Sequence, residues 1–514
     1  MTGTVAQWML LAGALVAAGL AGVRWLRVAQ REHYLPGSVL RFARRWWSIG
    51  PNRLLGAAAL IGLAGAAAGI TPSGLVAAAA VAVGPFGLTL KGRTAPLVWT
   101  RRLKVLAGTS AALAVTVVAI GAIGGLEVAA ATAILVAVAA PVVVDAASAL
   151  TGPLERRLGR RFVDQATAKL ASVHPRVVAI TGSYGKTTTK GYVAHLLAGT
   201  MTVVPTPRSY NNQSGLARAI NEQLLPGTDV FVAEMGTYGP GEIAEMCSWV
   251  TPDIAVITAI GPVHLERMKT EDRVAAAKAE ILERASVAVL NIDDARLANL
   301  AAGITPPMRL WRCSAVDRQA DVCVVHDDGS LRVFMESRQI ARVEGLDVPA
   351  TNVAVAVAVA LEVGVAPEAI AKRLLDLPTA AHRRQVTTGQ SGATVIDDTY
   401  NANPAGAASA LALFARLAEE SGSGHRIVVT PGMVELGDRQ AEENSRFAAA
   451  AAQLSTDLVI VGQTNAAALI SGSRGGRATV RRAPTRERAV AWVVTQLEPG
   501  DIVLYENDLP DHFP

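Results

Sequence analysis

The stretch RVVAITGSYGKTTTK, from Arg176 to Lys190, decides how the rest of this chain is interpreted. It begins with an apolar, β-branched run typical of a buried strand, and the glycine loop behind that run opens a helix. Backbone N–H groups around Gly182 and Gly185 can cradle phosphate oxygens at such a helix N-terminus. Lys186 would meet the β- and γ-phosphate charge, and Thr187 offers a hydroxyl to Mg²⁺. The stretch therefore predicts a phosphate site at the end of a strand.

The loop is a short variant of the phosphate-binding motif. The general pattern GxxxxGK[ST] would place a glycine at 180, where this chain has Ile180. The residues from Thr181 to Thr188 read TGSYGKTT instead. For such a loop taken alone, the alternative is a glycine turn that opens a helix and binds no ligand.

From about residue 174 onward, short apolar runs alternate with helical stretches, a pattern that indicates a parallel α/β sheet. A second series of the same kind begins near residue 385. Ligands of such sheets bind at the carboxyl ends of the strands. The strand-like runs are RVVAIT, DVFVAEMG, DIAVITAIG and SVAVLN in the first series, and ATVIDD, RIVVTPG, DLVIVG and DIVLYEN in the second.

The first 150 residues have a different character. The mean hydropathy of the 514-residue chain is +0.32 and only 18% of residues are charged, mainly because this part is so apolar. A membrane-spanning helix needs about 20 residues to cross a hydrocarbon core of about 30 Å. Five apolar segments approach that length, at roughly 5–26, 54–70, 74–90, 105–124 and 127–149.

Arginine and lysine gather in alternate connections between these segments. The two connections on one side are rich in arginine, whereas the turns near 71–73 and 124–127 carry no basic residue. The positive-inside bias then predicts a multi-pass inner-membrane domain with its N-terminus outside and residues after 150 in the cytoplasm. A cleaved signal peptide followed by buried helices is the alternative, but it explains only the first segment. The net charge of +5 therefore suggests a lipid bilayer as partner and no nucleic acid.

Three further residues suit a phosphate site, although each has an ordinary structural explanation. Glu234 ends a strand-like run, where a solvated strand terminus is common. His264 follows the next run, and a lone histidine is more often structural than a ligand. Lys278 lies on the helical stretch EDRVAAAKAEILERA, where a solvated face is the simpler interpretation.

Taken in order, however, the motifs resemble the Mur ligase family, and most closely the type that adds D-alanyl-D-alanine to the muramoyl tripeptide. The resemblance covers about residues 174–505. Each motif alone is weak, and only their order makes the resemblance specific. The series is ITGSYGKTTTK, NNQSG (211–215), AEMGTYGPGEI (233–243), ITAIGPVHLE (257–266), AKAEI (277–281), LNIDD (290–294), IDDTYNANP (396–404) and GMVELG (432–437).

The resemblance implies an ATP-dependent ligase that forms an amide between a carboxylate and an amino acid or short peptide, through an acyl phosphate. It implies a phosphate-loop central ATPase domain over 174–384 and a C-terminal Rossmann-like domain over 385–514. These domains would follow the helical membrane domain (1–150) and a linker (151–173). The overall fold class expected is therefore α/β behind a multi-span helical domain.

The resemblance also implies roles for individual residues. Lys186 would neutralise the transferring phosphoryl group, while Thr187 and Glu234 would hold one Mg²⁺. His264 would help to hold a second Mg²⁺, with Lys278 carbamylated by CO₂. Lys186, Glu234, His264 and Lys278 would thus be the catalytic set. The remaining ATP contacts implied are Gly182, Ser183, Gly185, Thr188, Asn291 (adenine), Arg383 (phosphates), Asp398 (ribose) and Asn401, with Tyr400 and Asn403 beside it.

The chain also departs from the family pattern on the substrate side. The family domain that grips the uridine nucleotide is replaced by the apolar segments. The pattern GxHNxxN keeps Asn352 but has Val348 in place of its histidine. The acid of LGDMxELG is replaced by Gly432, and the terminal GDxVLxKGS has lost its lysine. We therefore hypothesise a lipid-linked acceptor in cell-envelope synthesis, with a nucleotide-linked acceptor as the alternative. A polymerising ligase of the poly-γ-glutamate or capsule type and a non-catalytic membrane scaffold are the rival functions.

Overall fold

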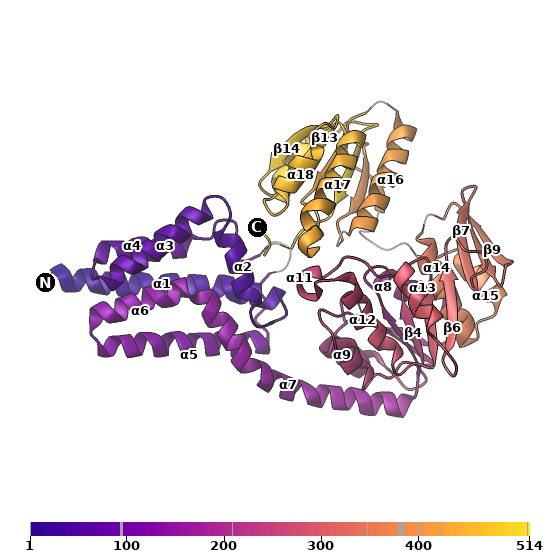
Figure 1. The fold of residues 1–514 in the computed structure, drawn as a ribbon, viewed down its shortest axis with the longest axis horizontal. Coiled ribbons are helices and arrows are strands. Elements are labelled where there is room, and N and C mark those ends of the chain that lie inside the picture. The colour runs from indigo at the N-terminus through magenta and orange to yellow at the C-terminus, as the bar shows by residue number, and fades with distance from the viewer. Residues whose placement is uncertain are drawn as a thin grey trace.

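The computed structural model describes residues 2–92, 96–207, 209–346, 348–378, 385–400, 403–422, 424–510 and 512–514. Three parts follow one another along the chain, as Figure 1 shows: a bundle of apolar helices, a central α/β domain and a C-terminal α/β domain. The predicted fold class, two α/β domains behind a helical domain, is confirmed. The C-terminus returns to lie against the helical bundle.

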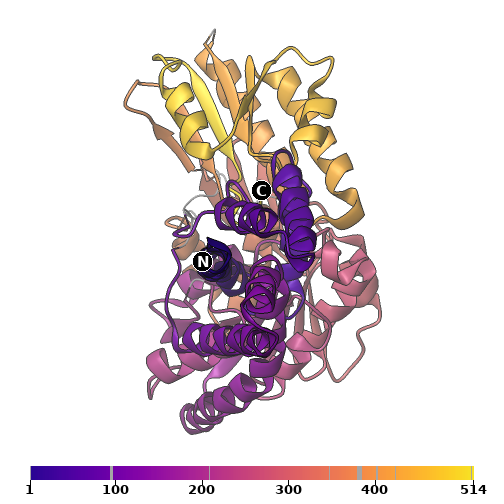
Figure 2. The same cartoon turned by 90° about the vertical axis from the view of Figure 1, so that its left-hand side faces the viewer.

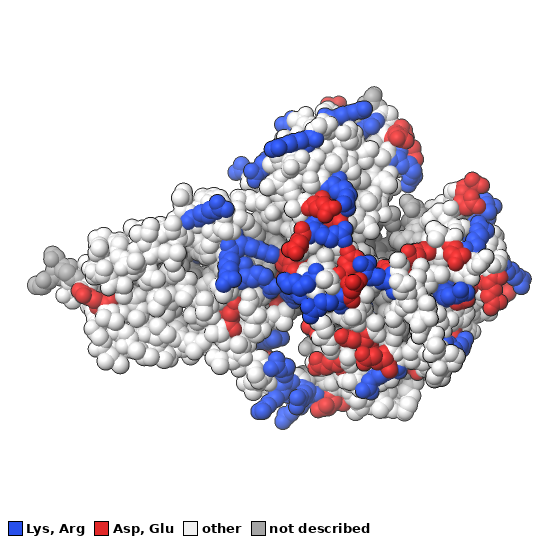
Figure 3. Space-filling view, viewed as in Figure 1, with Lys and Arg blue, Asp and Glu red and all other residues white. Residues whose placement is uncertain are grey.

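The N-terminal domain contains helices only. Seen end-on in Figure 2, its helices pack side by side in a bundle. The outer face in Figure 3 is almost free of charge, and lysine and arginine gather where the bundle meets the two other domains. The helices are α1 (Thr2–Arg31), α2 (Ser38–Trp47), α3 (Asn52–Ala67), α4 (Thr71–Val83), α5 (Arg101–Ile123), α6 (Leu126–Val138) and α7 (Ala140–Val173).

Among the described residues, the number of helices suited to spanning a membrane is smaller than the five predicted. By length and composition, α1 and α5 qualify, and up to four spans result if the bent pairs α2–α3 and α6–α7 each count as one. The segment expected over 74–90 forms only α4, which has 13 residues and ends before Gly84. At 1.5 Å per residue it is about 20 Å long, short of a bilayer core.

Residues 151–173 also differ from the expected linker, because they continue α7, which runs unbroken for 34 residues with Pro153 inside it.

Two charged side chains hold the helical domain together at its end nearest the other domains. Arg24 of α1 is buried and donates to the carbonyls of Val81, Ala82 and Gly84 at the C-terminus of α4, over 2.6–3.2 Å. A cation is favourable at the carbonyl-rich end of a helix. Asp145 of α7 accepts hydrogen bonds from the backbone N–H groups that begin α2.

The central domain is built on a nine-stranded sheet with the order β2-β3-β1-β4-β5-β6-β7-β8-β9. Strands β1 to β7 pair in parallel, and β8 and β9 add an antiparallel edge. The strands are β1 (Arg176–Thr181), β2 (Val203–Pro205), β3 (Val230–Glu234), β4 (Ile254–Ile257), β5 (Val287–Asn291), β6 (Arg309–Ser314), β7 (Val322–Asp327), β8 (Ser330–Met335) and β9 (Arg338–Glu344).

The helices of this domain pack on the sheet around two separate apolar clusters. Because α14 is apolar on all sides, it is buried throughout its middle turns. The helices of the central domain are α8 (Lys186–Leu197), α9 (Gln213–Gln223), α10 (Glu242–Cys247), α11 (Leu265–Met268), α12 (Glu271–Ala279), η1 (Glu280–Leu282), α13 (Ala295–Ala302), α14 (Ala350–Val363) and α15 (Pro367–Leu374).

The C-terminal domain carries a six-stranded sheet with the order β10-β11-β15-β12-β13-β14, parallel except for β10. Its last residues leave the sheet and pack on α2, where Trp46 Nε1 donates to the carbonyl of His512 over 2.9 Å. The elements are β10 (Gln385–Thr388), β11 (Thr394–Asp398), α16 (Pro404–Ser421), β12 (Arg426–Thr430), η2 (Gly437–Arg439), α17 (Gln440–Leu454), β13 (Asp457–Val461), α18 (Ala466–Ser473), β14 (Thr479–Ala483), α19 (Arg486–Val494) and β15 (Ile502–Glu506).

Glu362, at the end of α14, ties this buried helix to the sheet, and its side chain is only 3% exposed. It pairs with Arg176 at 2.9 Å and Arg309 at 3.1 Å, and it accepts from Trp311 Nε1 at 2.9 Å. We expect Glu362→Ala to lower the free energy of unfolding by about 2 kcal/mol, since both arginines are partly solvated. Chemical denaturation of the full chain in detergent measures this change.

Glu344→Ala is the matched control, because Glu344 and its partner Arg342 are both exposed. Equal losses for the two variants would contradict a structural role for Glu362.

Candidate active site

The phosphate loop joins β1 to α8, and two glycines set its shape. Gly182 and Gly185 have φ angles of 151° and 79°, which L side chains rarely adopt. A Cβ atom on Gly185 would lie 2.6 Å from Oδ1 of Asn352, in the first turn of α14. Asn352, the residue retained from the family pattern, therefore packs directly on the loop.

Lys186, the first residue of α8, folds back over the loop. Its Nζ donates to the carbonyl of Gly182 over 2.6 Å and lies 3.4 Å from that of Ser183. The Ser183 hydroxyl bridges to Gly261, accepting from its N–H over 3.0 Å. The loop is thus braced by the segment after β4, and Lys186 sits where a phosphate would be bound. Thr188, the third residue of α8, is buried.

Glu234 ends β3, next to β1 in the sheet, and its side chain is 3% exposed. Lys190 Nζ lies 2.9 Å from its carboxylate, and Asn211 Nδ2 donates to it over 3.3 Å. Burial opposes ionisation of this acid, but Lys190, Lys186 and a hydrogen bond from Thr187 outweigh burial and lower its pKa. Glu234 is therefore a carboxylate beside the hydroxyl of Thr187.

A carboxylate and a hydroxyl are hard oxygen donors of the kind that Mg²⁺ prefers, alongside waters and substrate phosphates. Among the described residues, no group of three or more His, Cys, Asp or Glu side chains would hold a metal unaided. Thr187 and Glu234 therefore fit an ion that is completed by nucleotide phosphates.

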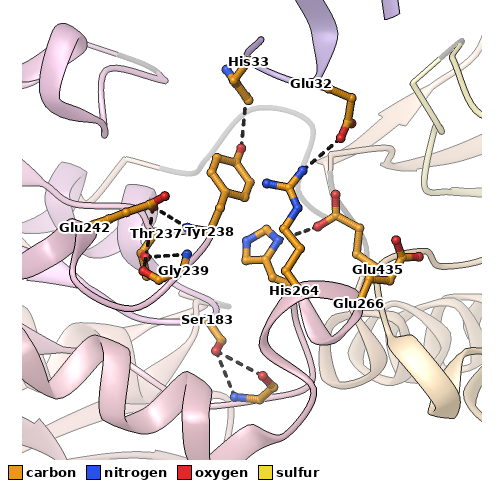
Figure 4. A network of polar contacts seen from close by, with 12 residues as sticks. Glu32, His33, Ser183, Thr237, Tyr238, Gly239, Glu242, His264, Glu266 and Glu435 are labelled. Carbon is orange, nitrogen blue, oxygen red and sulfur yellow. Dashed lines mark hydrogen bonds and ion pairs between the residues drawn. The ribbon is translucent and has the colours of Figure 1, made fainter. Parts of the chain in front are cut away.

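His264 follows β4 and precedes α11, with φ at 54°. Its Nδ1 lies 2.5 Å from Oε2 of Glu435, which comes from the C-terminal domain, and the Leu265 N–H donates to the Glu435 carbonyl over 2.9 Å. Figure 4 shows this pair beside the ring of Tyr238, whose centroid is 4.9 Å from that of His264 in an edge-on arrangement. Histidines that bind metals commonly hold a carboxylate with one nitrogen, leaving the other for the metal.

Lys278, in the last turn of α12, is 2% exposed. Burial, followed by the charge of Lys186, moves its pKa well below the ordinary value for lysine. The side chain is consequently disposed to be a neutral amine close to the phosphate loop. Among the described residues, no hydrogen bond or ion pair joins Lys278 to His264. That both residues bind the same metal ion therefore stays a prediction.

The other predicted nucleotide contacts have varied positions. Asn291 ends β5 and uses its amide to brace the segment after β4, donating to the Thr258 carbonyl over 3.0 Å. Asp398 ends β11, and Asn403 caps α16 by accepting from Gly406 N. Tyr400 is partly exposed. Arg383 and Asn401 lie outside the described residues.

Sequence reasoning assigned no individual role to Glu435 or Tyr238, although both lie inside motifs used for the resemblance. A local sequence motif does not indicate which of its side chains contacts a residue from another domain. Glu506, where the family pattern has lysine, was also missed. It is fully buried at the end of β15, and burial together with the charge of Asp398 raises its pKa to about 8.

Two family descriptions match this chain: "Mur ligase middle domain" over residues 180–360, and "Mur ligase, glutamate ligase domain" over residues 382–505. UDP-N-acetylmuramoyl-tripeptide–D-alanyl-D-alanine ligase of Mycobacterium tuberculosis (strain H37Rv) is 33% identical over 370 residues, which are 66% of this chain and 71% of the relative. The protein of the same name from Bacillus subtilis is 30% identical over 288 residues, covering 53% and 59%.

Solved structures of similar fold include MurF from Acinetobacter baumannii, with a TM-score of 0.59 and 24% identity over 68% of this chain and 77% of the other. The MurF ligase of Thermotoga maritima in complex with ADP has the same TM-score and identity, over 68% and 80%. At this identity the likeness shows a shared fold.

Replacing Gly185 tests the phosphate loop. We expect Gly185→Ala to weaken ATP binding at least about ten-fold, because a Cβ there meets Asn352 and the backbone strain alone costs about 1–3 kcal/mol. Titration with a fluorescent ATP analogue measures the affinity.

Gly191→Ala is the control in the same helix, since a Cβ at Gly191 meets nothing within 4 Å. An unchanged affinity for Gly185→Ala would show that the loop does not bind the nucleotide.

Proposed function

Because the chain belongs to the Mur ligase family and is an ATP-dependent acid–amino-acid ligase of peptidoglycan synthesis, we propose that it forms its amide bond at the inner face of the membrane. The acceptor carboxylate is carried on a lipid-linked precursor, and the amine comes from an amino acid or short peptide. The observation that supports this proposal best is that the candidate site lies against the ends of α1 and α2, in contact with the apolar domain.

In the first step, the residues of this chain act chiefly by placing positive charge beside the transferring phosphoryl group. The acceptor carboxylate attacks the γ-phosphorus of ATP, the bond to the ADP oxygen breaks, and an acyl phosphate results. Lys186 lies at the N-terminus of α8, where it neutralises charge on the transferring group. Thr187 and Glu234 would hold Mg²⁺, which would offset the negative charge of the phosphates.

In the second step, the amine attacks the acyl carbon, and phosphate leaves as the amide forms. His264 is held by Glu435 with one nitrogen directed away from that bond, which suits a ligand to a second Mg²⁺. Its partner comes from the C-terminal domain, so the contact between the two domains helps to hold the ring.

Lys278 completes the site as a carbamate. Only a neutral amine reacts with CO₂, and burial together with the charge of Lys186 shifts the pKa of Lys278 in the direction of that form. Carbamylation turns a repulsion between two lysines into an attraction between an anion and Lys186. It also supplies oxygen atoms that suit Mg²⁺.

Membrane anchoring is supported by the apolar helices and by their flanking charge. Two helices, or up to four with the bent pairs, are long and apolar enough to cross a bilayer. The relatives act, by their names, on a UDP-linked muramoyl tripeptide. In this chain the helical bundle precedes the central domain, and we propose that it positions an acceptor embedded in the same membrane.

The proposal is tested by assaying the full chain in lipid nanodiscs with lipid-linked and UDP-linked muramoyl peptides, ATP and a panel of amino acids and dipeptides. We expect amide formation on the lipid-linked acceptor, and we expect Lys186→Ala to lower its rate at least about 100-fold. Turnover on the UDP-linked tripeptide alone would contradict the lipid-linked acceptor. Products of increasing length would indicate a polymerising ligase, and activity unaffected by Lys186→Ala would contradict the proposed chemistry.

Carbamylation of Lys278 is tested by removing CO₂. We expect the wild-type rate to fall in bicarbonate-free buffer and to recover when bicarbonate is added back. Lys278→Glu, which supplies a fixed carboxylate, should respond to neither treatment while retaining part of the activity lost in Lys278→Ala. A wild-type rate that is independent of CO₂ would show that Lys278 acts as an unmodified amine.

A further inference from the structure

The end of α1 reaches the candidate active site. Directly after this helix, His33 and Tyr34 both have positive φ angles, 56° and 61°. Two consecutive side-chain-bearing residues in this region are unusual and cost backbone energy. This turn points Glu32 and His33 at the central domain, whereas the Tyr34 hydroxyl lies 3.4 Å from Thr100 Oγ1 within the helical domain.

His33 contacts Tyr238, which in turn contacts His264. Nε2 of His33 lies 3.2 Å from the Tyr238 hydroxyl, and the two rings are 5.3 Å apart. At this distance the Tyr238 hydroxyl can donate to Nε2 of His33. The Tyr238 ring also contacts His264, with the two centroids 4.9 Å apart. Three rings therefore run from the end of α1 to the candidate metal ligand.

Glu32 supports the same tyrosine by a second route. It accepts from Arg267 over 2.9 Å, and the guanidinium of Arg267 lies 4.7 Å from the centre of the Tyr238 ring. A cation placed over an aromatic face in this way is attracted to it. The carboxylate of Glu32 thereby directs Arg267 onto Tyr238.

The loop that carries Tyr238 is restrained on its other side as well. Glu242 accepts hydrogen bonds from the Tyr238 N–H over 2.8 Å and from the Thr237 hydroxyl over 3.1 Å. The backbone of the loop is thus held by its own domain, while the orientation of the Tyr238 ring depends on His33 and Arg267. A change at His33 would reach His264 through one ring.

From this arrangement we infer that His33, supplied by the helical domain, is a positioning residue of the ligase site, which orients His264 through Tyr238. The inference rests on the role of His264 under the proposed function. It implies that the helical domain does more than anchor the enzyme, because the metal site is incompletely ordered without the end of α1. Outer-shell partners of a metal-binding histidine typically change metal affinity by 10–100-fold.

The test uses the full chain in nanodiscs with a non-hydrolysable ATP analogue, and it follows Mn²⁺ binding by electron paramagnetic resonance. We expect two bound ions in the wild type, and we expect His33→Ala to weaken the second about ten-fold. Tyr238→Phe, which removes only the hydroxyl, should have a similar effect. His33→Gln, whose amide can accept the same hydrogen bond, should restore most of the affinity.

The double variant His33→Ala with Tyr238→Phe should be no weaker than the worse single variant, because both break one link. Additive losses would overturn the inference, as would a second ion bound normally by Tyr238→Phe. Tyr34→Phe is the matched control in the same turn, since its hydroxyl faces Thr100. An equal loss for Tyr34→Phe would assign the effect to the turn and would also overturn the inference.

The Mn²⁺ titration needs no acceptor, so it separates this inference from the proposed substrate. A normal second site in His33→Ala alongside active ligation would reject the inference and leave the proposed function standing. Weakened Mn²⁺ binding without turnover on any lipid-linked acceptor would support the inference and reject the substrate. In active preparations, His33→Ala should lower kcat about ten-fold while the KM for ATP stays within two-fold, since the phosphate loop is untouched.

Discussion

The arrangement of the three domains depends on one buried carboxylate. Glu32 is 6% exposed, and a charge so buried is tolerated only when cations surround it. It has a polar partner from each part of the chain: Arg267 at 2.9 Å from the central domain, His512 at 3.1 Å from the C-terminal domain, and Arg41 at 3.7 Å from its own. Burial opposes its ionisation, but these partners lower its pKa overall. Moving the central or the C-terminal domain would take one of these partners away from a buried carboxylate.

Each domain contributes residues to the candidate site near the place where the three domains meet. The central sheet places the phosphate loop and Glu234 at the carboxyl ends of adjacent strands, β1 and β3. The C-terminal domain contributes Glu435, which holds His264, and the segment after β15 packs on α2. The candidate site is therefore composite, and the helical domain contacts it through His33 and Tyr238.

Electrostatics inside the site favours a nucleotide. Lys186 and Lys190 flank Glu234, while Lys278 is buried near Lys186 without a carboxylate among the groups that shift its pKa. An excess of cationic groups around one loop is costly unless an anion is bound or a lysine is neutral. Binding of a triphosphate and carbamylation of Lys278 would each relieve that cost. The charge balance thus connects the phosphate loop with Lys278.

The sequence by itself determined the family, the order of the domains, the strands and the phosphate loop, because each follows from local periodicity or from motifs within one segment. RVVAIT forms β1 over the expected residues. Only the tertiary structure decided the length of α4, the continuation of α7 through 151–173, and the meeting of His33, Tyr238, His264 and Glu435. Those four residues are up to 402 positions apart, from 33 to 435. No local pattern encodes such a contact, because it arises from packing three domains around a buried charge.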